Sequence, residues 1–139
     1  MPEPLRIRRR AVLMLAGLGW SGAATAQRDA VEIRYLIVRE TVEPSGETAT
    51  RRFENAVVLA PGEMQEVDIR GEYRLNVELL ERGGQASVRL ALWDYERRGD
   101  FAGDGSAPLV IGGEAHLTLL VNSNVQYPIT LRSRWVRVP

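Results

Sequence analysis

Apolar and polar residues alternate along most of the chain after residue 27. The alternation is clearest in residues 31–37, 73–79, 88–92, 117–121 and 129–135. A period of two puts successive side chains on opposite faces of a strand, so each run has one apolar face and one mixed face. This pattern is typical of antiparallel sheets that pack one face on a core. No run after residue 27 has a convincing helical period over ten residues.

Turn-forming residues separate these runs. Glycine, proline and asparagine cluster at 44–46, 61–62, 83–84, 112–113 and 122–124. The pair Gly83–Gly84 favours a type I′ hairpin, because both central residues of that turn need positive φ. The pattern predicts strands over residues 30–42, 48–59, 64–70, 72–81, 85–95, 107–111, 115–121 and 126–136.

Seven or eight short strands with frequent turns indicate an all-β fold. We expect a small antiparallel sandwich, immunoglobulin-like in architecture, and a small β-barrel is the alternative. The expected core residues are Leu75, Val77, Leu90, Leu117, Leu119 and Trp135.

The N-terminal residues have the order of a secretory signal peptide. Arginines at positions 6 and 8–10 precede an apolar stretch over 11–20, and Ala24-Thr25-Ala26 follows. The apolar stretch is shorter than the ~20 residues that span a membrane, which argues against a retained anchor. We expect residues 1–26 to be cleaved and 27–139 to form one domain. The predicted location is bacterial, periplasmic or secreted, by the Sec route, with the twin-arginine route as the alternative because of Arg9-Arg10.

Composition makes several functions improbable for the expected domain. The chain has 18 basic and 18 acidic residues, and the leader removes more basic than acidic ones. A slightly acidic domain is a poor nucleic-acid binder. The absence of cysteine excludes thiol catalysis and thiolate zinc sites, and one histidine cannot build a histidine-rich metal site. We therefore expect no cofactor.

Two weak chemical patterns remain. Carboxylates at Asp94, Glu96, Asp100 and Asp104 fall within an expected loop over 94–106. Their spacing is wider than the alternate-residue spacing of calcium loops, so a solvated loop is the simpler interpretation. His116 could in principle form a catalytic Ser-His-Asp triad with Ser87, Ser106 or Ser123. However, the chain has no G-x-S-x-G turn, the motif that positions the nucleophilic serine in many hydrolases.

The polar faces of two strands, together with the adjoining loop over 94–106, are a candidate binding surface. Its candidate residues are Arg89, Trp93, Tyr95, Asp100, Phe101, Arg132 and Arg134. Arginine, tryptophan and tyrosine are enriched in binding hot spots. The residues share one surface if the strands at 85–95 and 126–136 are neighbours. The alternative is an ordinary solvated face.

These observations predict an exported, non-enzymatic module that binds another protein or assists an assembly. One such role is a chaperone-like factor for an extracellular fibre or pilus component, acting through an exposed sheet edge. The alternative is a small exported hydrolase or ligand-binding domain that uses carboxylates of the 94–106 loop.

Overall fold

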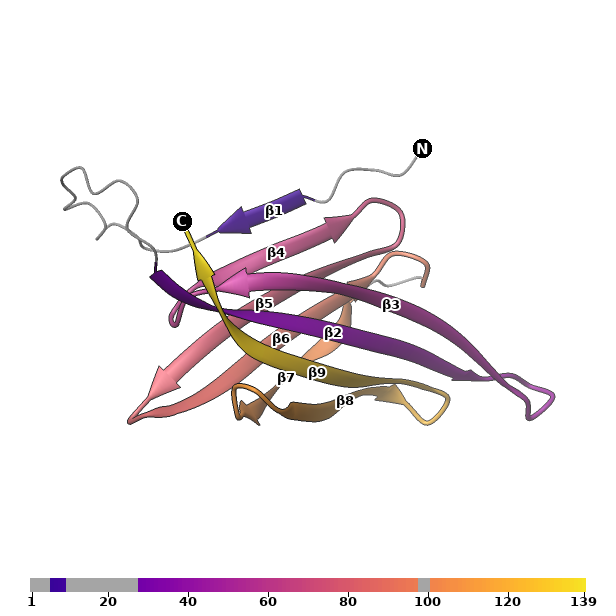
Figure 1. Cartoon of the computed structure of the whole chain (residues 1–139). Helices are drawn as coiled ribbons and strands as arrows, with labels where there is room; N and C mark the ends of the chain where they lie inside the picture. Colours follow the sequence, from indigo (N-terminus) through magenta and orange to yellow (C-terminus); the bar gives the residue numbers. More distant parts are fainter. Residues whose placement is uncertain (1–5, 10–27, 98–100) are drawn as a thin grey trace.

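The computed structural model describes residues 6–9, 28–97 and 101–139, which contain nine strands and no helix (Figure 1). The strands are β1 (Arg6–Arg9), β2 (Arg28–Val42), β3 (Thr48–Leu59), β4 (Met64–Ile69), β5 (Tyr73–Arg82), β6 (Gln85–Asp94), β7 (Phe101–Leu109), β8 (Glu114–Asn122) and β9 (Val125–Val138). Apart from Arg6–Arg9, the leader expected at 1–26 lies outside the described residues, and its removal stays a prediction.

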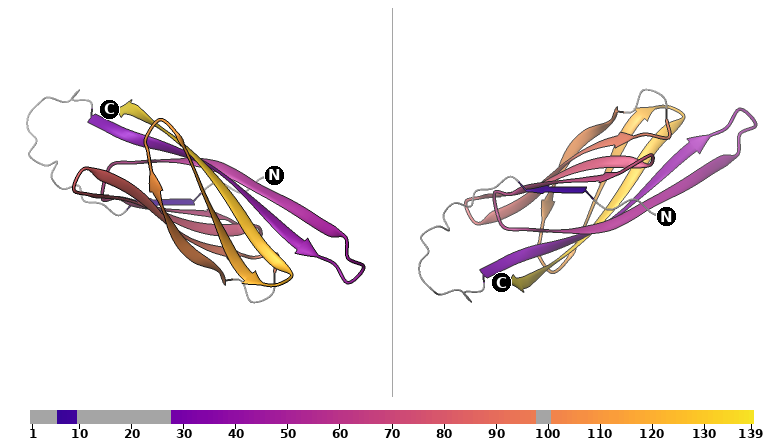
Figure 2. Two further views of the ribbon diagram at one scale, coloured as in Figure 1. Left: turned by 90° about the horizontal axis from the view of Figure 1, so that it is seen from below. Right: turned by 90° about the horizontal axis from the view of Figure 1, so that it is seen from above.

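Two antiparallel sheets pack on each other (Figures 1 and 2). One is a meander in the order β4-β5-β6-β7, with β1 added beside β4, and we call it the meander sheet. The other has the order β3-β2-β9-β8, and we call it the hairpin sheet because β2–β3 and β8–β9 are its two hairpins. The all-β, antiparallel, two-sheet prediction is confirmed. The sheets do not close on each other, so the alternative of a barrel was wrong.

The core between the sheets follows the predicted alternation. Leu75, Val77, Leu90 and Leu119 are buried as expected, and Leu117 is partly buried against them. Trp135 was predicted to be buried and is 54% exposed. The reason lies in strand length: β8 begins at Glu114, opposite Arg132, so Trp135 lies on a part of β9 that β8 does not flank.

One strand was wrongly placed by the sequence pattern. Residues 107–109 of the expected strand 107–111 are the end of a longer strand, β7, which begins at Phe101 and ends at Leu109. The expected loop over 94–106 is therefore strand from residue 101 onward. Gly103 and Gly105 have the composition of a loop but pair with Leu92 and Leu90 of β6.

Candidate functional site

A row of outward side chains crosses the meander sheet from edge to edge. The register pairs Asp68 with Arg74, Arg74 with Trp93, and Trp93 with Phe101. Their sequence neighbours in β4 to β6 point inward and are buried, so this row lies on the outer face.

Three side chains of this row stack on one another. The guanidinium carbon of Arg74 lies 4.0 Å from the centroid of the Trp93 ring. The Trp93 and Phe101 ring centroids are 5.2 Å apart with planes inclined at 53°. Both arrangements are favourable, the first as a cation–π contact and the second as a tilted aromatic pair. Phe101, at the end of the stack, is 49% exposed.

A β-bulge sets the direction in which Phe101 points. Leu92 pairs with Gly103, but Trp93 pairs with Phe101, so Ala102 is an extra residue in β7. Without the extra residue, Phe101 would face Asp94, an inward position. The bulge therefore moves an aromatic side chain from the core side to the outer face, as bulges commonly do. The φ of Gly103, 133°, permits the bulge because few other residues adopt it.

Tyr95 extends the aromatic group toward β4. Its hydroxyl donates a 3.0 Å hydrogen bond to Oδ1 of Asp68. Burial, with the Asp68 hydrogen bond, raises the pKa of the Tyr95 phenol. The ring itself is 37% exposed. We call Arg74, Trp93, Tyr95 and Phe101 the aromatic patch.

A shallow hollow of about 210 Å³ lies beside the aromatic patch on the same sheet. Its lining residues are Met64, Asn76, Glu78, Arg89, Leu90, Ala91 and Asp104. Oδ1 of Asn76 is buried there and is without a hydrogen-bond partner among the described residues. The hollow thus combines an unsatisfied amide oxygen with two carboxylates and a guanidinium.

The sequence-predicted surface is divided between the two sheets. Arg89, Trp93, Tyr95 and Phe101 belong to the outer face of the meander sheet. Arg132 and Arg134 lie on β9, outward from the hairpin sheet, and so face away from the others. Each has a carboxylate partner, 2.8 Å from Arg132 Nε to Glu114 and 2.7 Å from Arg134 Nε to Glu32. Asp100 lies outside the described residues.

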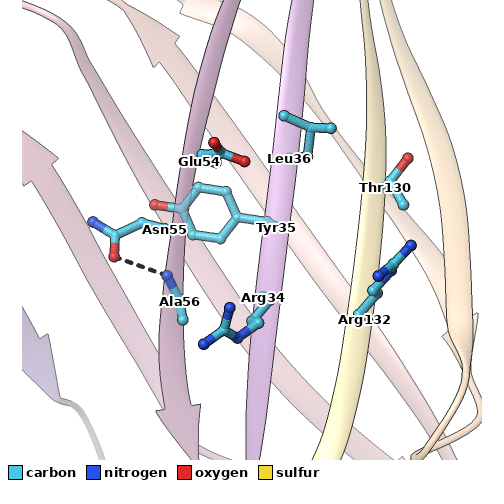
Figure 3. A pocket seen from close by; sticks show the side chains of 8 residues that line it. All are labelled: Arg34, Tyr35, Leu36, Glu54, Asn55, Ala56, Thr130 and Arg132. Atoms are coloured by element: carbon cyan, nitrogen blue, oxygen red, sulfur yellow. Dashed lines mark hydrogen bonds between the residues drawn. The ribbon is translucent and has the colours of Figure 1, made fainter.

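A larger hollow, of about 470 Å³, lies on the hairpin sheet (Figure 3). It is lined by Arg34, Tyr35, Leu36, Glu54, Asn55, Ala56, Thr130 and Arg132. Arg34 and Arg132 stand opposite each other in register, and carboxylates lie near both. The hollow is a gap between paired surface charges, and no exposed aromatic ring lines it.

Three of the four carboxylates considered for calcium lie in the described residues, and the two nearest each other are bound to arginine. Asp94 is buried and accepts hydrogen bonds from Arg39, Tyr127 and the Glu96 backbone. The Glu96 side chain contacts Arg51 and shares Arg39 with Asp94. Asp104 lies opposite Ala91 on the outer face of the meander sheet. Within 6–9, 28–97 and 101–139, no group of three or more histidine or carboxylate residues is placed to hold a metal ion.

His116 is exposed on β8, with Nε2 3.1 Å from Glu114 Oε1. Ser87 and Ser106 belong to the other sheet, on its outer face, so neither can form a triad with it. Ser123 lies in the turn between β8 and β9.

Comparisons with protein-family models, curated proteins and solved structures give no match to this chain. The described residues include no helix that is long and apolar enough to cross a membrane. The aromatic patch is the candidate site that the geometry of the chain itself supports best.

Proposed function

We propose that this protein is an exported, non-enzymatic binding module that holds another protein on the outer face of its meander sheet. The observation that carries the proposal is the stack of Arg74, Trp93 and Phe101, with Phe101 half exposed at its end. A half-exposed ring on a rigid sheet can be buried by a partner at little cost in conformational entropy. Aromatic and arginine side chains dominate the energy of many protein interfaces.

The surroundings of the aromatic patch have the composition of an interface rim. Glu78, Arg89 and Asp104 lie on the same face, two to four residues along the strands from the row that contains Trp93. Interfaces commonly have an apolar centre and a polar, partly hydrated border. A partner that packs on Phe101 would therefore contact an apolar centre and a polar border on the same sheet.

Export and an assembly role belong to the same proposal. The arginine-rich, apolar and small-residue order of the leader supports delivery to the periplasm or beyond. A chaperone-like role toward a fibre or pilus component agrees with a small sandwich that offers a binding face. We retain the immunoglobulin-like assignment as a proposal, on the support of two antiparallel sheets packed across one core.

A ligand-binding domain is the second candidate, and one observation favours it. The hollow beside the aromatic patch is lined by Asn76, whose buried Oδ1 has no hydrogen-bond partner among the described residues, and by Glu78 and Asp104. A buried acceptor without a partner is costly, and a bound hydroxyl or amine would satisfy it. In this candidate Asp104 comes from the segment that the sequence pattern placed in a loop.

Site-specific photo-crosslinking in the producing cell tests the main proposal. A crosslinking residue at Phe101 should capture a protein that the same residue at Thr130, on the hairpin sheet, does not. The captured protein is identified by mass spectrometry, purified and titrated against wild type and Phe101→Ala. We expect Phe101→Ala to weaken binding roughly 30-fold, the equivalent of about 2 kcal/mol for a hot spot, without lowering the unfolding temperature by more than a few degrees.

Two results would overturn the proposal. Equal capture from Phe101 and Thr130 would show that the aromatic patch has no special role. A hydrolytic activity that is lost in both Glu78→Gln and Asp104→Asn, with Phe101→Ala fully active, would replace the binding module by the second candidate.

A further inference from the structure

The edge of the meander sheet at β4 holds a strand from the far N-terminal part of the chain. Arg6–Arg9 pairs antiparallel with β4, with Arg6 opposite Asp68 and Arg9 opposite Gln65 (Figure 1). Residues 10–27 separate this strand from β2, and the expected leader ends at residue 26. Cleavage after residue 26 would remove β1 and leave β4 as the edge.

The other sheet edges are less open to an added strand. β7, at the opposite edge of the meander sheet, lies against β8 of the hairpin sheet. At the edge formed by β3, one backbone amide of the strand and one directly after it already have side-chain acceptors. Val58 N donates to Gln65 Oε1 at 3.3 Å, and Ala60 N donates to Glu63 Oε1 at 2.7 Å. The edge of β4 is the one that this chain itself fills with a strand.

The register at β4 specifies the side chains that an added strand should carry. Asp68 and Glu66 occupy outer-face positions, and the register places Arg6 and Arg8 opposite them. Between them Val67 is buried, and Ile7 is opposite it. Opposite charges at facing positions stabilise a strand pair, and an apolar residue between them suits the core side. The matching segment is extended, with arginines at alternate positions around an apolar residue.

We propose that the β4 edge is a strand-addition site for such an arginine-bearing segment. In the uncleaved chain Arg6–Arg9 fills it, and after removal of the leader a partner protein supplies the segment. Backbone hydrogen bonds to β4 then provide the affinity, and the acidic positions of β4 provide the specificity. This site adjoins the aromatic patch, since Asp68 also accepts the hydrogen bond of Tyr95. The step in which a partner replaces Arg6–Arg9 rests on the proposed export and removal of the leader.

Hydrogen exchange on the full chain tests the proposal. Wild type is compared with Arg6→Glu/Arg8→Glu, which places like charges opposite Asp68 and Glu66. We expect faster amide exchange over 64–69 in this variant, while exchange in β2 and β9 stays unchanged. Arg8→Glu alone is the milder variant, used if the double variant does not fold.

A peptide with the sequence of residues 4–11 is then added to the double variant. We expect it to restore protection over 64–69, whereas the same peptide with Arg6 and Arg8 replaced by glutamate does not. Wild type should bind the peptide at least tenfold more weakly than the double variant, because its own tethered segment competes. Phe101→Ala should leave all of these results unchanged, which separates this site from the aromatic patch.

Unchanged exchange over 64–69 in the variants would overturn the proposal. Equal protection by the arginine and glutamate peptides would also overturn it, since charge would then play no part. Protection of 64–69 that rises with protein concentration in the absence of peptide would assign the edge to a second copy of the chain and not to an arginine-bearing partner.

Discussion

The hydroxyl of Tyr127 donates a 2.7 Å hydrogen bond to Oδ2 of Asp94, and both side chains are completely buried. The two residues come from different sheets, β9 and β6. Arg39, on β2, donates to the same oxygen at 2.8 Å. Burial, together with the hydrogen bond to Asp94, raises the pKa of the Tyr127 phenol. The carboxylate therefore links the two sheets through buried polar contacts.

We expect Tyr127→Phe to lower the free energy of unfolding by about 1–3 kcal/mol. The substitution keeps the ring and removes a single donor to a buried carboxylate. Asp94→Ala should cost more, about 3–5 kcal/mol, because it leaves the buried Tyr127 hydroxyl without its acceptor and the Arg39 guanidinium with only its 3.5 Å contact to Glu96. Urea unfolding of the two variants and wild type measures both losses in the free energy of unfolding. A loss for Asp94→Ala no larger than that for Tyr127→Phe would show that the Arg39 contact contributes little.

Leu90 tests the core between the sheets. Its side chain is 1% exposed, so Leu90→Ala should lower the free energy of unfolding by about 2–5 kcal/mol. Leu120, which is 72% exposed on β8, is the matched control. Leu120→Ala should change stability by less than about 0.5 kcal/mol. Similar losses at the two positions would contradict the assigned strand faces.

The sequence predicted most of this core because its signal is local. Alternation fixes which face of a strand is apolar, and it placed Leu75, Val77 and Leu90 correctly. Trp135 continues the same alternation, yet its burial depends on where the neighbouring strand β8 begins. Where a neighbouring strand begins depends on how the strands pair, and the alternation within a single strand does not reveal it.

The candidate site was partly predictable for a similar reason. The sequence pattern proposed Trp93 and Phe101 as binding residues by their type, but their contact depends on the bulge at Ala102. The separation of Arg132 from Trp93 depends on which strands share a sheet, and alternation does not encode strand order. The nearby Gly103 and Gly105 were taken as loop residues, although a glycine within a strand also marks a bulge.

The ion pair of Glu32 with Arg134 gives a pH-dependent prediction. The hydrogen bond from Arg134 lowers the pKa of the Glu32 carboxyl. A lowered folded-state pKa contributes stability above the unfolded-state pKa of about 4.3, and this contribution is lost as pH falls through the folded-state pKa. We therefore expect Glu32→Gln to be less stable than wild type at pH 7 and equally stable near pH 2.

Thermal unfolding across that pH range measures the difference between Glu32→Gln and wild type. Arg134→Gln is the control, because it removes the same pair from the other side and should show the same pH trend. A constant difference between Glu32→Gln and wild type at every pH would mean that packing, not charge, explains the effect. High salt should reduce the pH 7 difference, since both groups are near the surface.

The bulge in β7 gives the last prediction. Gly103 has φ of 133°, a conformation in which a side chain is strained by about 1–3 kcal/mol. Gly103→Ala should therefore destabilise the bulge, and with it the register that pairs Phe101 with Trp93. We expect a lower unfolding temperature and a shifted NMR resonance of the Trp93 indole N–H, because the neighbouring ring moves.

Gly105→Ala is the matched control, two residues further along the same strand. Gly105 does not have a positive φ, and its added methyl would lie 3.1 Å from Cδ1 of Leu117, the movable end of a side chain. The adjustment falls on the core side, so the Trp93 resonance should stay close to its wild-type position even if stability drops slightly. A shift in Gly105→Ala equal to that in Gly103→Ala would mean that general strain in β7, and not the bulge, controls the aromatic patch. An unshifted resonance and unchanged stability in Gly103→Ala would show that Phe101 reaches the outer face without the glycine.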